Sequence, residues 1–129
     1  MSGSFLLDTN IVIGLLAGEP AIQIHFEGDV SAFIPAIVIG ELYYGAFASG
    51  RRDENIKRID ELVRGANVLD CDAGTGRYYG EVKARLRQRG RLIPENDVWI
   101  AALALQNGLT LASRDSHFDE VDNVMRESW

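Results

Sequence analysis

Short apolar runs alternate along the chain with longer segments in which apolar and polar positions recur at helical spacing. Each apolar run is bounded by glycine, proline or polar residues, which is typical of short buried strands. The pattern predicts strands at residues 5–7, 30–34, 67–69 and 109–112, and a last edge strand at 124–125. We therefore expect a central sheet of four to five short strands.

The segments between these strands have the spacing and the end signals of helices. Within residues 53–65, for example, the apolar residues follow one another at spacings of three and four and mark one buried face. They are Ile56, Ile59, Leu62 and Val63. Glycines that end helices follow two of the later segments. The predicted helices cover residues 9–17, 21–27, 36–49, 53–65, 73–89 and 97–106.

Strands and helices that alternate in this way predict an α/β fold, a three-layer sandwich around a mostly parallel central sheet. A chain of 129 residues suits one domain, so we expect a single domain over residues 1–129. In such sheets ligands bind beyond the carboxyl ends of the strands, where the strand order reverses. Acidic residues that directly follow predicted strands are therefore the first candidates for a functional site.

Charge is unevenly distributed along the chain. The formal net charge is −6, which on its own argues against binding to nucleic acid. Residues 77–91, however, contain six basic residues and one acid, so this segment is suited to a polyanion. A solvated face of a helix is the alternative explanation of the same run.

The apolar start of the chain has the features of neither a secretion signal nor a membrane span. Asp8 interrupts residues 5–17, and no basic residue precedes them. The run is also too short to cross a bilayer. The single cysteine, Cys71, cannot form an internal disulfide, and we expect a cytoplasmic protein.

Four acidic residues lie where the pattern predicts the core or its rim. Asp8 directly follows the first strand, and Asp115 follows the fourth strand after two residues. Glu41 lies inside an apolar helical stretch, and Asp97 lies at the first turn of a very apolar helix. Taken singly, Asp8 and Asp97 are equally well explained as helix caps, and Asp115 as a turn residue. Glu41 has no such structural explanation.

Taken together, the four acids point to a bound cation. Buried carboxylates that lie close to one another raise one another's pKa values unless a cation lies among them. Carboxylate oxygens are hard ligands that suit Mg²⁺ or Mn²⁺. We therefore expect the four acids to converge at the strand ends and to hold one or two such ions.

The motifs around these acids resemble those of a known family. They read Asp8-Thr9-Asn10, Ile39-Gly40-Glu41-Leu42, Asn96-Asp97-Val98-Trp99-Ile100-Ala101 and Ser113-Arg114-Asp115-Ser116-His117-Phe118. In order and spacing they are similar to the four acidic motifs of PIN-domain nucleases, above all the VapC-type toxins of bacterial toxin–antitoxin pairs, including the FitB-like branch. The resemblance spans nearly the whole chain. It implies a divalent-metal-dependent endoribonuclease that hydrolyses RNA phosphodiester bonds with metal-activated water.

The resemblance also implies roles for single residues. The catalytic and metal-binding site would consist of the four acids, Asp8, Glu41, Asp97 and Asp115. Of these, we expect Asp8 and Asp97 to be the primary ligands of Mg²⁺ or Mn²⁺. Polar motif positions that would support the acids are Thr9, Asn10 and Ser113. Basic residues placed to contact RNA are Lys83, Arg87, Arg91 and Arg114.

The expected partners follow from the same resemblance. It implies a homodimer, an RNA substrate and a VapB-like antitoxin that covers the active site, with no membrane involved.

Other functions stay open on the sequence alone. A haloacid-dehalogenase-like phosphohydrolase also begins with an apolar strand and an aspartate, but its second aspartate would fall at Asn10. A non-catalytic module that binds metal or RNA would use the same acids without chemistry. A nuclease that acts on DNA is a further alternative, because nothing in the sequence reads the 2′-hydroxyl of RNA.

Overall fold

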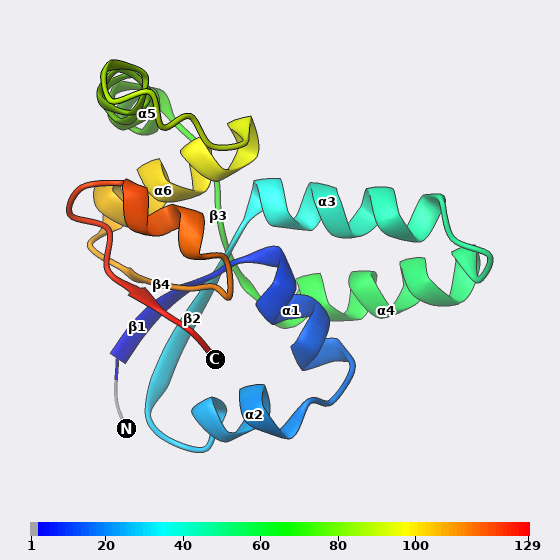
Figure 1. The fold of residues 1–129 in the computed structure, drawn as a ribbon. Coiled ribbons are helices and arrows are strands. Elements are labelled where there is room, and N and C mark those ends of the chain that lie inside the picture. Colours follow the sequence, from blue (N-terminus) through cyan, green and yellow to red (C-terminus); the bar gives the residue numbers. More distant parts are fainter. Residues whose placement is uncertain (1–2) are drawn as a thin grey trace.

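The computed structural model describes residues 3–129, which form a five-stranded sheet with helices on both sides (Figure 1). The strands are β1 (Gly3–Leu7), β2 (Val30–Pro35), β3 (Asn67–Leu69), β4 (Thr110–Ala112) and β5 (Arg126–Glu127). Neighbouring strands are all parallel, in the order β3-β2-β1-β4-β5. The predicted α/β fold is confirmed, and the sheet is parallel throughout.

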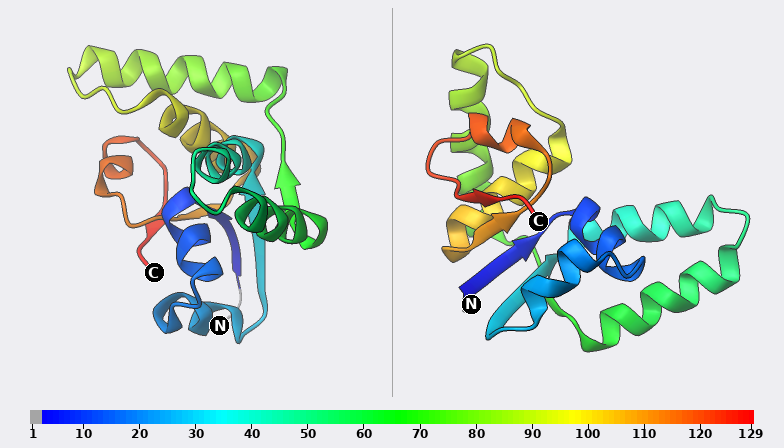
Figure 2. Two further views of the ribbon diagram at one scale, coloured as in Figure 1. Left: turned by 90° about the vertical axis from the view of Figure 1, so that its right-hand side faces the viewer. Right: turned by 60° about the horizontal axis from the view of Figure 1, so that its bottom comes forward.

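Six α-helices and two short 3-10 helices connect the strands. They are α1 (Thr9–Leu16), α2 (Pro20–Gln23), η1 (Ile24–Phe26), α3 (Ala36–Phe47), α4 (Arg52–Gly65), α5 (Ala73–Gln88), α6 (Glu95–Asn107) and η2 (Ser116–Glu120). α5 packs on α6 on one side of the sheet, and α1 and α2 lie on the other side (Figures 1 and 2). The α3–α4 hairpin projects beyond the edge of the sheet. Over residues 3–129, no helix is both long and apolar enough to cross a membrane.

The strand order reverses at β1, the central strand. From β1 the chain moves outward through β2 to β3, and it then returns to form β4 and β5 on the opposite side of β1. The carboxyl ends of β1 and β4 therefore lie side by side where ligands bind in parallel sheets. The register pairs Leu7 at the end of β1 with Ala112 at the end of β4, so the residues that follow both strands emerge together.

The core explains why the site can be rigid. Phe5, Leu6 and Leu7 of β1 are buried, and the α6 residues from Ile100 to Ala104 are all buried as well. α6 is covered by the sheet on one side and by α5 on the other, so its residues need no polar face. A close-packed interior of this kind fixes the strand ends and the start of α6 relative to one another.

Two predicted elements differ from those observed. The last strand lies at Arg126–Glu127 and not at residues 124–125. Val124 does pack against the core, as its apolar side chain indicated, but strand pairing begins only two residues later. Met125, which completed the apolar pair, is exposed. The predicted helix over residues 21–27 is one α-helical turn that tightens into the 3-10 helix η1.

Candidate active site

The four acids come from four separate elements and line one hollow. Asp8 follows β1, Glu41 lies on α3, Asp97 lies in the first turn of α6, and Asp115 lies in the loop after β4. The hollow is open, has a volume of about 620 Å³ and lies at the carboxyl ends of the central strands. The structure thus brings together side chains that are far apart in the sequence, at the place where the strand order reverses.

Asp8 is held by three hydrogen bonds. Its Oδ1 accepts from the backbone N–H of Thr9 at 2.8 Å, which makes Asp8 the N-cap of α1. Its Oδ2 accepts from the Ser113 hydroxyl at 2.6 Å and from Asn10 Nδ2 at 3.2 Å. Only 3% of the residue is exposed, so the carboxylate is fixed in one orientation. Capping α1 and facing the hollow are therefore compatible roles of the same side chain.

The polar motif residues tie the loop after β4 to the start of α1. Ser113 Oγ accepts from the backbone N–H of Asp115 at 3.0 Å while it donates to Asp8. Asn10 Oδ1 accepts from the N–H of Arg114 at 3.2 Å, and Asn10 Nδ2 donates to Asp115 Oδ2 at 3.4 Å. Ser113 and Asn10 thus link the two loops that carry Asp8 and Asp115.

The surroundings of three of the acids disfavour their charged forms. Burial is the largest cause that raises the pKa of Asp8, and the nearby charge of Asp115 raises it further. Burial also raises the pKa values of Glu41 and Asp97, and the charge of Asp8 adds to both. Hydrogen bonds lower the pKa of Asp8, and the His117 ring lowers the pKa of Asp97. Neither effect is large enough to cancel the increase. A cation in the hollow would relieve the repulsion.

Unpartnered polar atoms are the structural sign that this hollow suits a cation. Glu41 Oε1 and Thr9 Oγ1 are buried and have no hydrogen-bond partner among residues 3–129. The Thr9 hydroxyl lowers the pKa of Glu41, although the geometry of the two groups falls short of a hydrogen bond. A buried carboxylate oxygen without a partner is costly unless an ion binds it.

The spacing of the acids fits an ion that keeps much of its water. Within the part of the chain that the structure describes, no three His, Cys, Asp or Glu side chains are close enough to hold an ion by themselves. Mg²⁺ does not need such a cage, because it usually binds one or two carboxylates, several waters and substrate phosphates. The donor set is made of hard oxygens and therefore fits Mg²⁺ or Mn²⁺.

The raised pKa values predict an unusual pH dependence of stability when no divalent ion is added. The ordinary values are 3.8 for Asp8 and Asp97 and 4.5 for Glu41, so above about pH 4 the folded state holds protons that the unfolded state has released. The free energy of unfolding should therefore fall as the pH rises from about 4 to 6 in chelator. Urea denaturation across this range measures it.

Two other carboxylates have pKa values shifted in the opposite direction and serve as an internal comparison. The pKa values of Asp72 and Asp119 are lowered, mainly by hydrogen bonds from Gln106 and Arg126, so their contribution is lost only as the pH falls below 3.8. The two effects occupy separate pH ranges. Stability in chelator that rises steadily from pH 4 to 6 would contradict the burial of uncompensated acids in the hollow.

One residue of the hollow, His117, is not among the predicted site residues. It lies on η2, and its Nε2 is 2.7 Å from Asp97 Oδ2. Its position two residues after Asp115 was the available signal in the sequence. The 3-10 helix that brings its ring toward α6 could not be predicted from apolar periodicity, because it spans only five residues.

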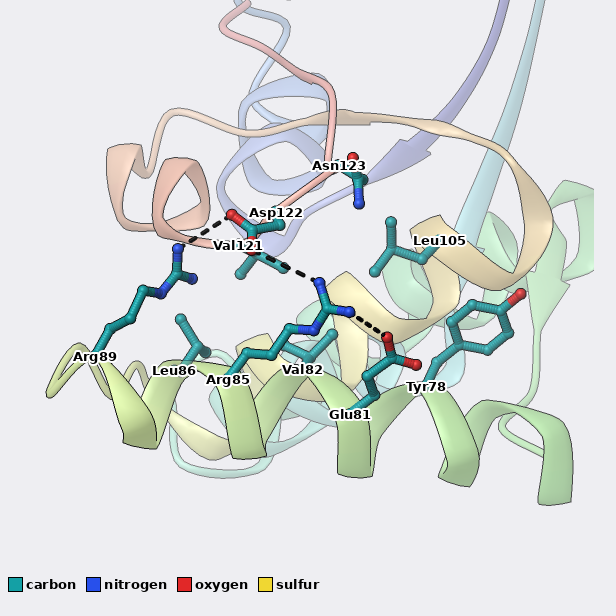
Figure 3. Close-up of a pocket in the computed structure, with 10 residues that line it drawn as sticks. All are labelled: Tyr78, Glu81, Val82, Arg85, Leu86, Arg89, Leu105, Val121, Asp122 and Asn123. Carbon is teal, nitrogen blue, oxygen red and sulfur yellow. Dashed lines mark hydrogen bonds and ion pairs between the residues drawn. The ribbon is translucent and has the colours of Figure 1, made fainter.

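The basic segment on α5 is largely paired with acids of this chain. Arg85 contacts Glu81 of the same helix at 2.9 Å. Arg89 contacts Asp122 at 3.1 Å across a small cavity of about 120 Å³ between α5 and residues 121–123 (Figure 3). The predicted RNA-contacting residue Lys83 pairs with Glu95 at 2.9 Å, and Glu95 lines the acid hollow. These pairs are exposed, so each contributes little stability.

The other predicted RNA contacts have different surroundings. Arg91 lies 3.8 Å from Glu120, and Arg87 is exposed and, within residues 3–129, has no ion pair. Arg114 turns its guanidinium away from Asp115, toward Glu19 at 3.2 Å and the backbone oxygen of Trp129 at 2.7 Å. Contacts of these residues with RNA stay a prediction.

The chain is similar in sequence to known proteins over nearly its whole length. Residues 5–124 match the family model of the PIN domain. The chain is 35% identical to Ribonuclease VapC2 of Haemophilus influenzae, and the match covers 97% of each sequence. It is 31% identical to the tRNA(fMet)-specific endonuclease VapC of Shigella flexneri, again over 97% of each.

A solved structure shows a similar fold over nearly the same length. The crystal structure of VapBC2 from Rickettsia felis, bound to a DNA fragment from its promoter, contains a chain that superposes with a TM-score of 0.91. The match covers 98% of both chains at 27% identity. The fold that positions the hollow is therefore shared with that chain.

Proposed function

This chain belongs to the PIN-domain family, and on that premise we propose that it is the ribonuclease toxin of a VapC-type toxin–antitoxin pair, which hydrolyses RNA phosphodiester bonds. The observation that carries the proposal is the convergence of four acids from separate elements on one hollow at the strand-order reversal. Full-length relatives that are named ribonucleases support RNA as the substrate. The same family membership speaks against the haloacid-dehalogenase-like phosphohydrolase.

We propose that Asp8, Glu41, Asp97 and Asp115 form the site of the divalent ion, Mg²⁺ or Mn²⁺, with Asp8 and Asp97 as its primary ligands. When bound, such an ion activates water for attack and neutralises charge on the phosphate. Asn10 and Ser113 keep Asp8 and the loop of Asp115 in fixed positions through the hydrogen bonds given above. Burial of Asp8 excludes bulk water from one side of the site, which strengthens electrostatic contacts there.

A second hollow offers a place for the antitoxin. It has a volume of about 320 Å³, lies between α1, α3 and α4, and is lined mostly by apolar side chains. Ile13 and Glu41 line both this groove and the acid hollow, so the two are continuous. We propose that a VapB-like antitoxin lies in this groove and from there covers the acids. The structural relative from Rickettsia felis was solved as a VapBC complex, which supports a partner of this kind.

Two further parts of the proposal concern assembly and location. We propose that the protein acts in the cytoplasm, where its RNA substrate and its antitoxin are made.

We also propose that it forms a homodimer. Exposed Tyr78 and Leu92 are candidates for the contact, since aromatic and apolar side chains are enriched at subunit interfaces. Light scattering of the purified protein measures the mass in solution.

The proposed function has a direct test. Purified protein is incubated with labelled RNA, including tRNA(fMet), and with labelled DNA, each in Mg²⁺, in Mn²⁺ and in chelator. We expect cleavage of RNA with either ion and none in chelator, because water attacks a phosphodiester slowly without an activating ion. Cleavage that persists in chelator would refute the metal site. Hydrolysis of a phosphomonoester with RNA left intact would instead support the phosphohydrolase.

A further inference from the structure

We propose that His117 is a positioning residue, which holds the carboxylate of Asp97 in the orientation that binds the divalent ion. The inference rests on the proposed function, because it assigns Asp97 to the ion. It adds to the four-acid site a fifth side chain that acts through Asp97 and does not itself bind the ion.

The position of the His117 ring is fixed by the core. His117 lies on η2, between Asp115 and the fully buried Phe118. The two rings contact each other, with centroids 5.0 Å apart and planes inclined by 46°. Because Phe118 anchors η2 in the core, the backbone that carries the imidazole is held in place beside α6. About a third of the His117 side chain is exposed, on the side of the hollow.

His117 is the side chain that orients Asp97. Nε2 of His117 lies 2.7 Å from Asp97 Oδ2, and the Asp97 side chain is only 15% exposed. Among residues 3–129, no other group makes a side-chain hydrogen bond to Asp97. An ionised carboxylate only accepts hydrogen bonds, so Nε2 carries the hydrogen and donates it. With Oδ2 held in this way, Oδ1 remains available to an ion in the hollow.

The contrast with Asp8 shows why this single bond matters. Asp8 accepts three hydrogen bonds and would keep its orientation if one were lost. Asp97 depends on one donor, which comes from a different element, so the bond also joins the loop after β4 to the first turn of α6. Partners that orient metal ligands typically contribute about 10-fold to 100-fold in metal affinity.

The same ring has a second conceivable role, which the geometry disfavours. A cationic imidazole that takes the place of the ion would bridge the acids at hydrogen-bond distance. His117 Nε2 is instead bonded to Asp97 and lies 4.0 Å from Asp115 Oδ2, beyond hydrogen-bond reach. The ring therefore makes a hydrogen bond to one acid and does not bridge the four.

The test measures binding of Mn²⁺ alone to the full chain, without RNA, by electron paramagnetic resonance of the free ion. We expect His117→Ala to weaken Mn²⁺ binding by about 10-fold to 100-fold. His117→Gln should recover most of the affinity, because its side-chain amide can donate to Asp97. The control His25→Ala removes the histidine that stacks on Trp129 and should bind Mn²⁺ as the parent does. Melting in chelator establishes that each variant is folded.

The two hypotheses fail in distinguishable ways. Parental Mn²⁺ affinity in His117→Ala would overturn the positioning role, and tighter binding would show that the ring competes with the ion. Loss of affinity in His117→Gln as large as in His117→Ala would also overturn it, because the donor would then not matter. If the parent binds Mn²⁺ and His117→Ala does not, the role stands even where RNA is left uncut, and only the ribonuclease proposal fails. A parent that binds no Mn²⁺ overturns both.

Discussion

Replacement of Asp8 by asparagine should lower the rate of RNA cleavage in saturating Mg²⁺ by at least about 100-fold. Asparagine keeps the shape of the side chain and removes its charge, so the loss measures the contribution of the charge to holding the ion. Stabilisation of a transition state by a metal is worth several kcal/mol, and each ~1.4 kcal/mol corresponds to a tenfold change in rate. Initial rates on a labelled RNA measure the effect.

Stability data separate this catalytic role from helix capping. Asparagine Oδ1 can still accept from the N–H of Thr9, and the substitution removes a buried charge that burial disfavours. In chelator, Asp8→Asn should therefore melt no lower than the parent. Asp70→Asn, which removes the same charge from an exposed position after β3, should leave cleavage unchanged. Parental cleavage by Asp8→Asn would refute the assignment of Asp8 to the ion. A clearly lower melting temperature would show that the hydrogen bonds which Oδ2 accepts from Ser113 and Asn10 outweigh the relief of the buried charge.

Replacement of Gly45 by tryptophan should weaken inhibition by the antitoxin while RNA cleavage continues. Gly45 lines the apolar groove between α1, α3 and α4, and within residues 3–129 a Cβ built on it meets no atom within 4 Å apart from its chain neighbours and the backbone of its own helix. An indole at this position would fill space that the antitoxin is proposed to occupy. Because the groove is central to that contact, we expect at least about a tenfold weaker complex, as for truncation or blocking of a binding hot spot.

A matched variant distinguishes blockage from damage to the fold. Gly45→Ala adds only a methyl group to the same open position and favours the helix, since glycine inside a helix costs about 1 kcal/mol relative to alanine. It should bind the antitoxin as the parent does. The antitoxin is the small protein that we expect to be encoded beside this gene. Full inhibition of Gly45→Trp, measured by titration of the cleavage assay, would place the antitoxin elsewhere.

Local pattern was sufficient to predict most elements of the fold because apolar spacing reports which faces are buried. The helix over 53–65 has one apolar stripe and corresponds closely to α4 (Arg52–Gly65). The strand order could not be predicted in the same way, since pairing depends on which strands meet in space. β5 shows this limit: it has two residues, and Leu111 of β4 sets its register.

The candidate site was predictable to the extent that its residues break the local pattern. Asp8 and Glu41 interrupt apolar stretches, so a charge there demanded a partner. The surroundings of the basic residues depended instead on tertiary structure. Lys83 pairs with Glu95, and Arg89 with Asp122, which lies 33 positions later. His117 was left out of the predicted site for the same reason, because only the fold brings its ring to Asp97.

The position of β1 in the middle of the sheet has a consequence for synthesis of the protein. β1 is the first strand to be made, yet it pairs with β4, and the hydrogen bond from Ser113 to Asp8 joins residues 105 positions apart. Non-local pairings of this kind form late in folding, since the intervening chain must be ordered first. On the ribosome, an emerging chain cannot assemble the four acids until nearly all of it has been translated. The activity that we propose for this site is thereby withheld from every unfinished copy.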